Sequence, residues 1–122
     1  MAAPTLFATA AERRAAAARR SLVGIRSHNG GGSGAVWTSD GLIITNHHVV
    51  PGERALVELH DGRTFESRVA RRDAEHDLAA LRIDATDLEP VEPRESPLRP
   101  GELVFAVGNP WGERAVVTAG VV

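Results

Sequence analysis

The sequence predicts an all-β protein, a single small β-barrel of six to seven antiparallel strands with a short N-terminal helix. Three observations support this fold class. From Ser21 onward, β-branched and apolar residues come in short runs separated by glycine, aspartate and proline. Two Asp-Gly pairs stand between alternating runs, which is a strong hairpin signal. The first 20 residues are instead rich in alanine and arginine.

The helix is expected over about residues 6–20. Thr9 and Glu12 have the spacing of a capping box at a helix start. Alanines 15–18 have high helix propensity, and Arg19 and Arg20 would interact favourably with the negative end of the helix dipole. We therefore assign residues 1–20 to an N-terminal helical segment.

The strands follow in order along the chain. Residues 21–27 and 34–45 supply the first runs, and the Asp40-Gly41 pair divides the second of them into a hairpin. Residues 55–72 form another hairpin around Asp61-Gly62, with Ala55, Val57 and Leu59 facing inward. Residues 77–83 and 102–108 supply two further strands, separated by a proline-rich, acidic surface loop.

The last eight residues, AVVTAGVV, read as one more strand at residues 115–122. No turn, charge or polar tail follows it. A bare strand edge of this kind can pair with another chain, so the sequence suggests self-association through the C-terminal strand. It also suggests a chain cut in the middle of a fold.

Composition excludes several classes of function. The net charge is −2, and acidic residues balance the arginine pairs, including Arg71 and Arg72, which have no aromatic residues between them. We therefore expect no binding to nucleic acid, and we expect these arginines to lie on a solvated face. Without cysteine there is neither a disulfide nor a thiolate nucleophile. No stretch has the features of a secretory signal or the length of a membrane span, and the localisation stays unassigned.

Three motifs then occur in order: GSGAVWTSDGLIITNHHVV, DAEHDLAALRI and LRPGELVFAVGNPWGERAVVTAGVV. Together they resemble the HtrA branch of the trypsin-like serine proteases over about residues 21–122. The resemblance implies that residues 21–114 are the first barrel of a double-barrel protease domain. It implies that residues 115–122 begin a truncated second barrel.

The resemblance implies different roles for the two adjacent histidines of TNHHVV. In an extended strand their side chains would point to opposite faces, so at most one would face a given cleft. The family pattern implies that His48 is the general base of the catalytic triad. His47 is expected to be a supporting or solvent-exposed imidazole.

The resemblance places the triad carboxylate at Asp77, in the DLA motif. A triad carboxylate accepts a hydrogen bond from one ring nitrogen of the histidine and so fixes the tautomer. The hairpin between positions 48 and 77 can bring the two together. Asp73 is expected to serve in a turn or cap.

The third triad member is missing from these 122 residues. The family carries its nucleophile in a GNSGG segment of the second barrel, and neither GNSGG nor GxSxG occurs here. Ser33 matches the family's GSG at a strand entry, and Ser39 and Ser96 have no supporting motif. We therefore expect the chain by itself to be inactive.

No metal or other cofactor is expected. The five histidines lack the spacing of a zinc-protease motif, and His60 adjoins a solvent-facing turn. The GNPWG segment lacks the lysine and the following helix of a phosphate loop.

The sequence thus indicates a fragment of an HtrA-like serine endopeptidase that, when complete, hydrolyses peptide bonds in polypeptide substrates. The alternative is a non-catalytic binding or scaffold module that derives from one protease barrel.

Overall fold

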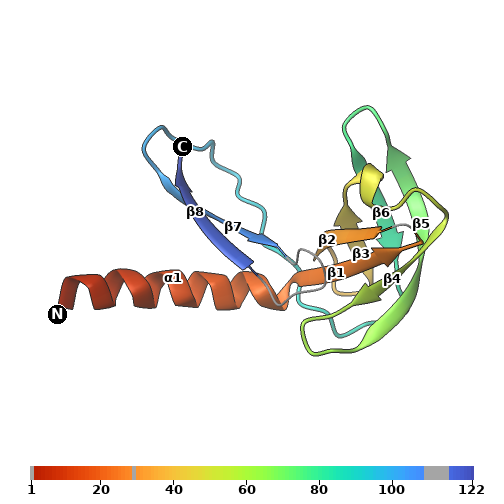
Figure 1. Ribbon diagram of the computed structural model, residues 1–122, viewed down its shortest axis with the longest axis horizontal. Coiled ribbons are helices and arrows are strands. Elements are labelled where there is room, and N and C mark those ends of the chain that lie inside the picture. Colours follow the sequence, from red (N-terminus) through yellow and green to blue (C-terminus); the bar gives the residue numbers. More distant parts are fainter. Residues whose placement is uncertain (1, 29, 109–115) are drawn as a thin grey trace.

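The computed structural model describes residues 2–28, 30–108 and 116–122. It contains one long helix, a closed barrel and a separate two-stranded sheet (Figure 1). The elements run in the order α1 (Ala2–Arg20), β1 (Leu22–Ser27), β2 (Gly30–Val36), β3 (Leu42–Thr45), the 3-10 turn η1 (His47–Val49), β4 (Arg54–Glu58), β5 (Thr64–Asp73), β6 (Leu78–Arg82), β7 (Leu103–Gly108) and β8 (Val116–Val121). The expected all-β barrel with an N-terminal helix is confirmed.

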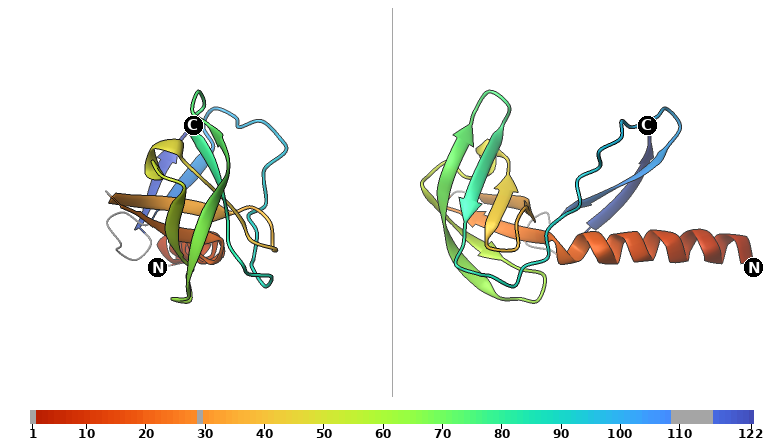
Figure 2. Two further views of the ribbon diagram at one scale, coloured as in Figure 1. Left: turned by 90° about the vertical axis from the view of Figure 1, so that its right-hand side faces the viewer. Right: turned by 180° about the vertical axis from the view of Figure 1, so that it is seen from behind.

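The barrel has six strands, in the spatial order β1-β2-β3-β6-β5-β4. All neighbouring strands are antiparallel, and β4 pairs back onto β1 to close the cylinder. Closure leaves none of these six strands with a free edge. The helix extends away from the barrel, and β7 and β8 lie above it (Figures 1 and 2).

The core fills the barrel with aliphatic side chains from all six strands. Each such side chain, when fully buried, contributes roughly 1.5–3 kcal/mol to folding. In the β4–β5 hairpin the inward residues are those that the alternating pattern predicted, with Val57 completely buried and Glu58 exposed. The most deeply buried aliphatic residues are Val23, Ile25, Val36, Ile43, Val50, Val57 and Leu81.

Both predicted Asp-Gly hairpins are confirmed, as β2–β3 and β4–β5. Gly41 has a φ of 113° and Gly62 a φ of 91°, a backbone conformation that favours glycine. Gly41 also lies against the residue that follows β6, because the Gly41 carbonyl accepts from the backbone N–H of Ile83 at 2.9 Å. The turn thereby ties the β2–β3 hairpin to the end of β6.

The helix begins earlier than its sequence signals predicted. It starts at Ala2, so the interpretation of Thr9 as an N-cap is wrong. Pro4 lies in the first turn, where proline is tolerated, and the alanines around Thr9 favour helix on both sides. No helix in the described part of the chain is both long and apolar enough to cross a bilayer.

The strand at residues 103–108 lies outside the closed barrel. It pairs with β8, from Leu103 opposite Val121 to Gly108 opposite Val116. The loop before it follows the barrel wall, where the backbone N–H of Val91 donates to the carbonyl of Val36 at 2.9 Å. The expected acidic loop at residues 86–100 thus connects two separate sheets.

An arginine-glutamate cluster anchors the end of this loop. Nη1 and Nη2 of Arg94 donate to the Glu102 carboxylate at 2.5 and 2.9 Å, and Nε of Arg99 donates to it at 2.8 Å. These arginines, Arg94 first, lower the pKa of Glu102 to about 2. Backbone bonds between residues 101–102 and Val122 adjoin the cluster.

A Gly41→Ala substitution is expected to destabilise the barrel by about 1–3 kcal/mol. The new Cβ would lie 2.1 Å from the carbonyl oxygen of Ile83, and φ is unfavourable for alanine. Urea unfolding measures the change. Gly52→Ala is the matched control, because its Cβ would meet nothing within 4 Å. Equal stability of the two variants would contradict the packing argument.

The Glu102 cluster predicts an acid-dependent change at the turn before β7. Because the folded pKa of Glu102 is about 2 and its ordinary value is 4.5, the cluster's contribution is complete above pH 4.5 and is lost as the pH falls toward 2. The amide NMR shifts of Gly101 and Val122 should follow this transition. Glu102→Gln should remove it, whereas Glu95→Gln, an exposed glutamate of the same loop, should retain it.

Candidate active site

The candidate site lies where η1 meets the turn between β5 and β6. His48 belongs to η1, which follows directly on β3, and Asp77 immediately precedes β6. Because β3 and β6 are neighbouring antiparallel strands, with Thr45 opposite Ala79, the end of one strand lies beside the start of the other. The barrel therefore brings together two residues that are 29 positions apart in the chain.

The Asp77 carboxylate binds His48 twice. Oδ2 lies 2.6 Å from Nδ1 of the imidazole, and Oδ1 accepts from the backbone N–H of the same histidine at 2.9 Å. A carboxylate can only accept, so Nδ1 carries the proton and Nε2 of the neutral ring keeps a free lone pair. The side chain of His48 is 71% exposed, and its contact with the carboxylate uses Nδ1 and not Nε2.

The backbone of Asp77 is held in an unusual conformation. Its φ of 53° is the one positive value among the non-glycine residues that the structure describes. Aspartate tolerates this left-handed region better than most residues. Nδ2 of Asn46 donates to the Asp77 carbonyl at 3.0 Å, and the backbone N–H of Asp77 donates to the carbonyl of Ala74 at 3.3 Å. The turn thus directs the carboxylate toward η1.

The hydrogen bonds also set the charge state of the pair. The pKa of the Asp77 carboxyl lies below its ordinary value, chiefly because the backbone N–H of His48 donates to it. Partial desolvation opposes this shift, and the ring N–H, together with the charge that the imidazole carries when it is protonated, reinforces it. Asp77 is therefore ionised at neutral pH and can stabilise a protonated His48.

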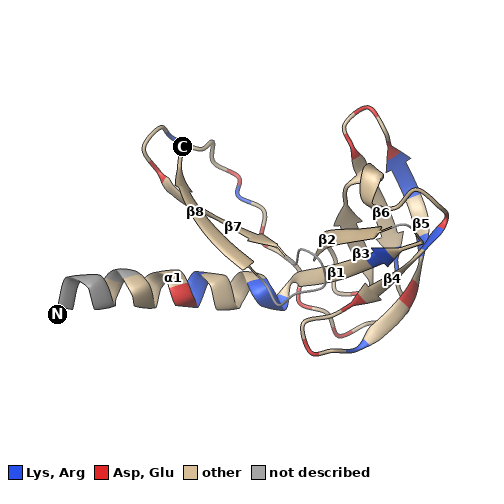
Figure 3. Cartoon of the chain, viewed as in Figure 1, with Lys and Arg blue, Asp and Glu red and all other residues tan. Residues whose placement is uncertain are grey.

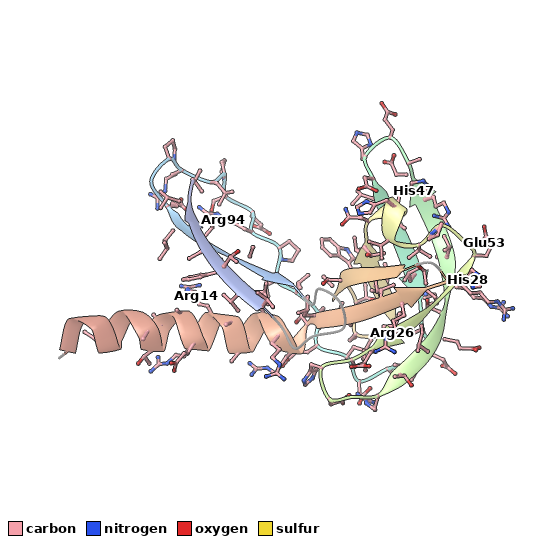
Figure 4. The ribbon with its side chains drawn as sticks, viewed as in Figure 1. Arg14, Arg26, His28, His47, Glu53 and Arg94 are labelled. Atoms are coloured by element: carbon pink, nitrogen blue, oxygen red, sulfur yellow. The ribbon has the colours of Figure 1, made fainter. Side chains whose placement is uncertain are left out.

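His47 faces a different neighbour. It is half-buried, and its Nδ1 lies 3.1 Å from Nη1 of Arg72. The 3-10 turn, rather than an extended strand, separates the directions of the two histidines, and Figure 4 shows His47 on η1 at this end of the barrel. The expectation of a supporting imidazole at His47 agrees with this contact.

Asp73 forms a second carboxylate-imidazole pair close by. Its Oδ2 lies 2.8 Å from Nδ1 of His76, and its Oδ1 accepts from the backbone N–H of His76 at 3.2 Å. Both partners are three residues apart in one turn. The predicted turn role of Asp73 is confirmed, and it leaves Asp77 as the carboxylate that reaches η1.

Each of the three serines considered as nucleophiles takes part in a hydrogen bond that belongs to the barrel or its loops. The carbonyl of Ser33, on β2, accepts from Oγ1 of Thr45 at 2.7 Å. The carbonyl of Ser39 accepts from the backbone N–H of Leu88, and Oγ of Ser96 accepts from Nε of Arg94 at 3.1 Å. Each of the three lies in or beside a turn or strand contact.

Two residues of the site had no role in the sequence analysis. Asn46 holds the Asp77 backbone, and Arg72 contacts η1 although its sequence context indicated a solvated face. The TNHHVV segment contains Asn46 and could have drawn attention to it. Within the residues described, no three histidine or carboxylate side chains gather closely enough to hold a metal ion.

Known proteins are similar to this chain in sequence. Residues 32–122 match the family described as "Trypsin-like peptidase domain". The chain is 44% identical over 94 residues to "Serine protease HTRA1B" of Danio rerio, and the match covers 75% of this chain and 20% of that protein. It is also 44% identical over 97 residues to "Protease Do-like 1, chloroplastic" of Arabidopsis thaliana. That match covers 76% of this chain and 22% of that protein.

A solved structure agrees with the fold as well as with the sequence. The serine endoprotease from Yersinia pestis superposes with a TM-score of 0.81 at 34% identity, over 91% of this chain and 43% of that one. The chain spans about a fifth of the length of the curated relatives named here. With barrel, motifs and relatives in agreement, this chain belongs to the trypsin-like peptidase family and is of the HtrA type.

Proposed function

We propose that this chain supplies the histidine and the aspartate of a serine endopeptidase that hydrolyses peptide bonds in polypeptide substrates. The observation that carries the proposal is the double contact of Asp77 with His48, through the ring at 2.6 Å and the backbone at 2.9 Å. It is the arrangement that a general base requires in acyl transfer.

In this mechanism His48 acts through Nε2. The ring nitrogen takes the proton of a serine hydroxyl as that oxygen attacks the scissile carbonyl, and later returns it to the leaving amine. Asp77 holds the tautomer that leaves Nε2 unprotonated and stabilises the positive charge that develops on the ring. The ionised state of its carboxyl at neutral pH suits this task.

The proposal assigns the nucleophile and its oxyanion donors to a second barrel. Neither GNSGG nor GxSxG occurs in the 122 residues. It keeps the division of the chain into a helix at 1–20, a first barrel at 21–114 and the start of a second barrel from 115. The strand pairing favours an earlier change of sheet, because the six barrel strands end at Arg82 and β7 already pairs with β8 outside the barrel.

A chimera tests the catalytic assignment. The chain is continued in frame with the part of the Yersinia pestis endoprotease that follows the matched region, and casein hydrolysis and fluorophosphonate labelling are measured. Asp77→Asn should lower kcat about 10⁴-fold, because an amide favours the wrong histidine tautomer. Asparagine tolerates a positive φ, so the turn should persist.

Asp73→Asn is the matched control, because Asp73 pairs with a histidine of its own turn, and it should stay within about tenfold of the parent. The 122-residue chain alone should neither hydrolyse casein nor be labelled. Full activity of the Asp77→Asn chimera, or labelling of Ser33 in the isolated chain, would contradict the assignment. A folded but inactive parent chimera would support the non-catalytic binding module instead.

The proposal includes self-association of the 122-residue chain through β8. Every residue of β8 is exposed, and among the described strands it pairs with β7 alone. Val121 is 69% exposed at the end of this strand. An open apolar edge of this kind promotes pairing between chains.

Size-exclusion chromatography with light scattering should show oligomers of the 122-residue chain, and Val121→Lys should shift them toward the monomer, because a charge on an edge strand opposes pairing. Leu98→Lys is the control, since Leu98 is exposed in the preceding loop rather than on β8. A stable monomer of the parent chain would refute the proposal.

A further inference from the structure

The β5 strand changes the direction of its side chains just before the site. Its pairing with β6 runs regularly to Val69 opposite Leu81 and then continues with Arg71 opposite Ala80. Ala70 is therefore an extra residue, a bulge in the ladder. Before the bulge the odd-numbered residues of β5 face the barrel, as Ser67 and Val69 do.

After the bulge the even-numbered position faces inward. Arg72 is half-buried, whereas Arg71 is exposed. Both arginines lie in the blue end of β5 in Figure 3, but only a single inserted residue decides which of them turns toward η1. Bulges beside functional sites re-aim side chains in this way.

Arg72 then makes three contacts with the segment that carries His48. Nη1 donates to the carbonyl of Val50 at 2.6 Å and lies 3.1 Å from Nδ1 of His47. Nη2 donates to the carbonyl of Gly52. The guanidinium thus binds the first residue of η1, His47, and two residues that follow the turn, of which Val50 is fully buried.

The planar fork of arginine explains why this residue type suits the position. Two of its nitrogens reach two carbonyls and an imidazole at once, which the single ammonium of lysine cannot reproduce. A guanidinium has no acceptor, so Nδ1 of His47 is the acceptor in their contact. Arg72 thereby orients His47 as well as the backbone after it.

His48 itself has few other restraints. Its side chain is 71% exposed, so packing contributes little to its position. The turn is closed by the backbone N–H of Val49, which donates to Asn46 at 3.1 Å, and that of Val50, which donates to His47 at 3.2 Å. Arg72 binds the carbonyl and the imidazole that flank this second bond.

We propose that Arg72 is a positioning residue for His48, aimed at η1 by the β5 bulge so that its guanidinium fixes the turn and holds Nδ1 of His48 against Asp77. This positioning role of Arg72 rests on the proposed general-base role of His48. The restraint on the turn does not depend on that role and is measured separately.

The experiment uses the 122-residue chain and NMR. In Arg72→Met, amide hydrogen exchange at His48 and Val49 should quicken roughly tenfold, because the turn opens locally. The low-field resonance of the His48 Nδ1 proton should broaden or disappear. Exchange at Ile25, in the barrel wall, should remain at the parent rate, which separates local opening from loss of the fold.

Arg71→Met is the matched control, since it removes the same charge from the adjacent, exposed position. Its His48 signals should equal those of the parent. Arg72→Lys keeps the charge and covers the case in which Arg72→Met does not fold; faster His48 exchange is expected there too. Parent-like His48 signals in Arg72→Lys, or equal effects of Arg71→Met and Arg72→Met, would overturn the proposal.

This outcome is independent of the chimera. If Asp77→Asn left the chimera active, the catalytic assignment would fail while the NMR result still reported whether Arg72 holds the turn. If Asp77→Asn inactivated the chimera and His48 were unaffected by Arg72→Lys, the catalytic assignment would stand without the positioning role.

Discussion

The contact between Asp77 and His48 is the interaction on which the candidate site depends. One carboxylate accepts from both the backbone and the ring of the same histidine, so it fixes where His48 lies and which ring nitrogen carries the proton. The backbone bond is also the main reason that the pKa of the carboxyl is lowered. Position, tautomer and charge thus have a common origin.

The barrel makes this contact by strand pairing. The end of β3 and the start of β6 meet because the two strands are neighbours, although the β4–β5 hairpin intervenes in the sequence. Closure gives both strands a partner on each side, which holds the two ends of the site in register. The exposed histidine therefore depends on a rigid, fully paired wall rather than on packing around its own ring.

Three arrangements around the site share one feature, which is that polar side chains satisfy backbone groups of the turns. Asn46 binds the carbonyl of Asp77, Asp73 binds the N–H of His76, and Arg72 binds the carbonyls of Val50 and Gly52. Backbone groups in turns lack ladder partners, and unpaired ones are costly where they are buried. The same bonds that satisfy these groups restrict the positions of His48 and Asp77.

The sequence by itself determined the fold class, because alternating runs and two Asp-Gly turns are local signals that each hairpin satisfies on its own. It also pointed to His48 and Asp77, because the motifs that contain them resemble those of the HtrA-type proteases. The tertiary structure decided that these two residues meet, since their contact depends on the pairing of β3 with β6. It decided the sheet to which residues 103–108 belong, because strand partners are non-local. It also decided which arginine faces η1, because a bulge arises from the mismatch between two strands and leaves no mark in either one alone.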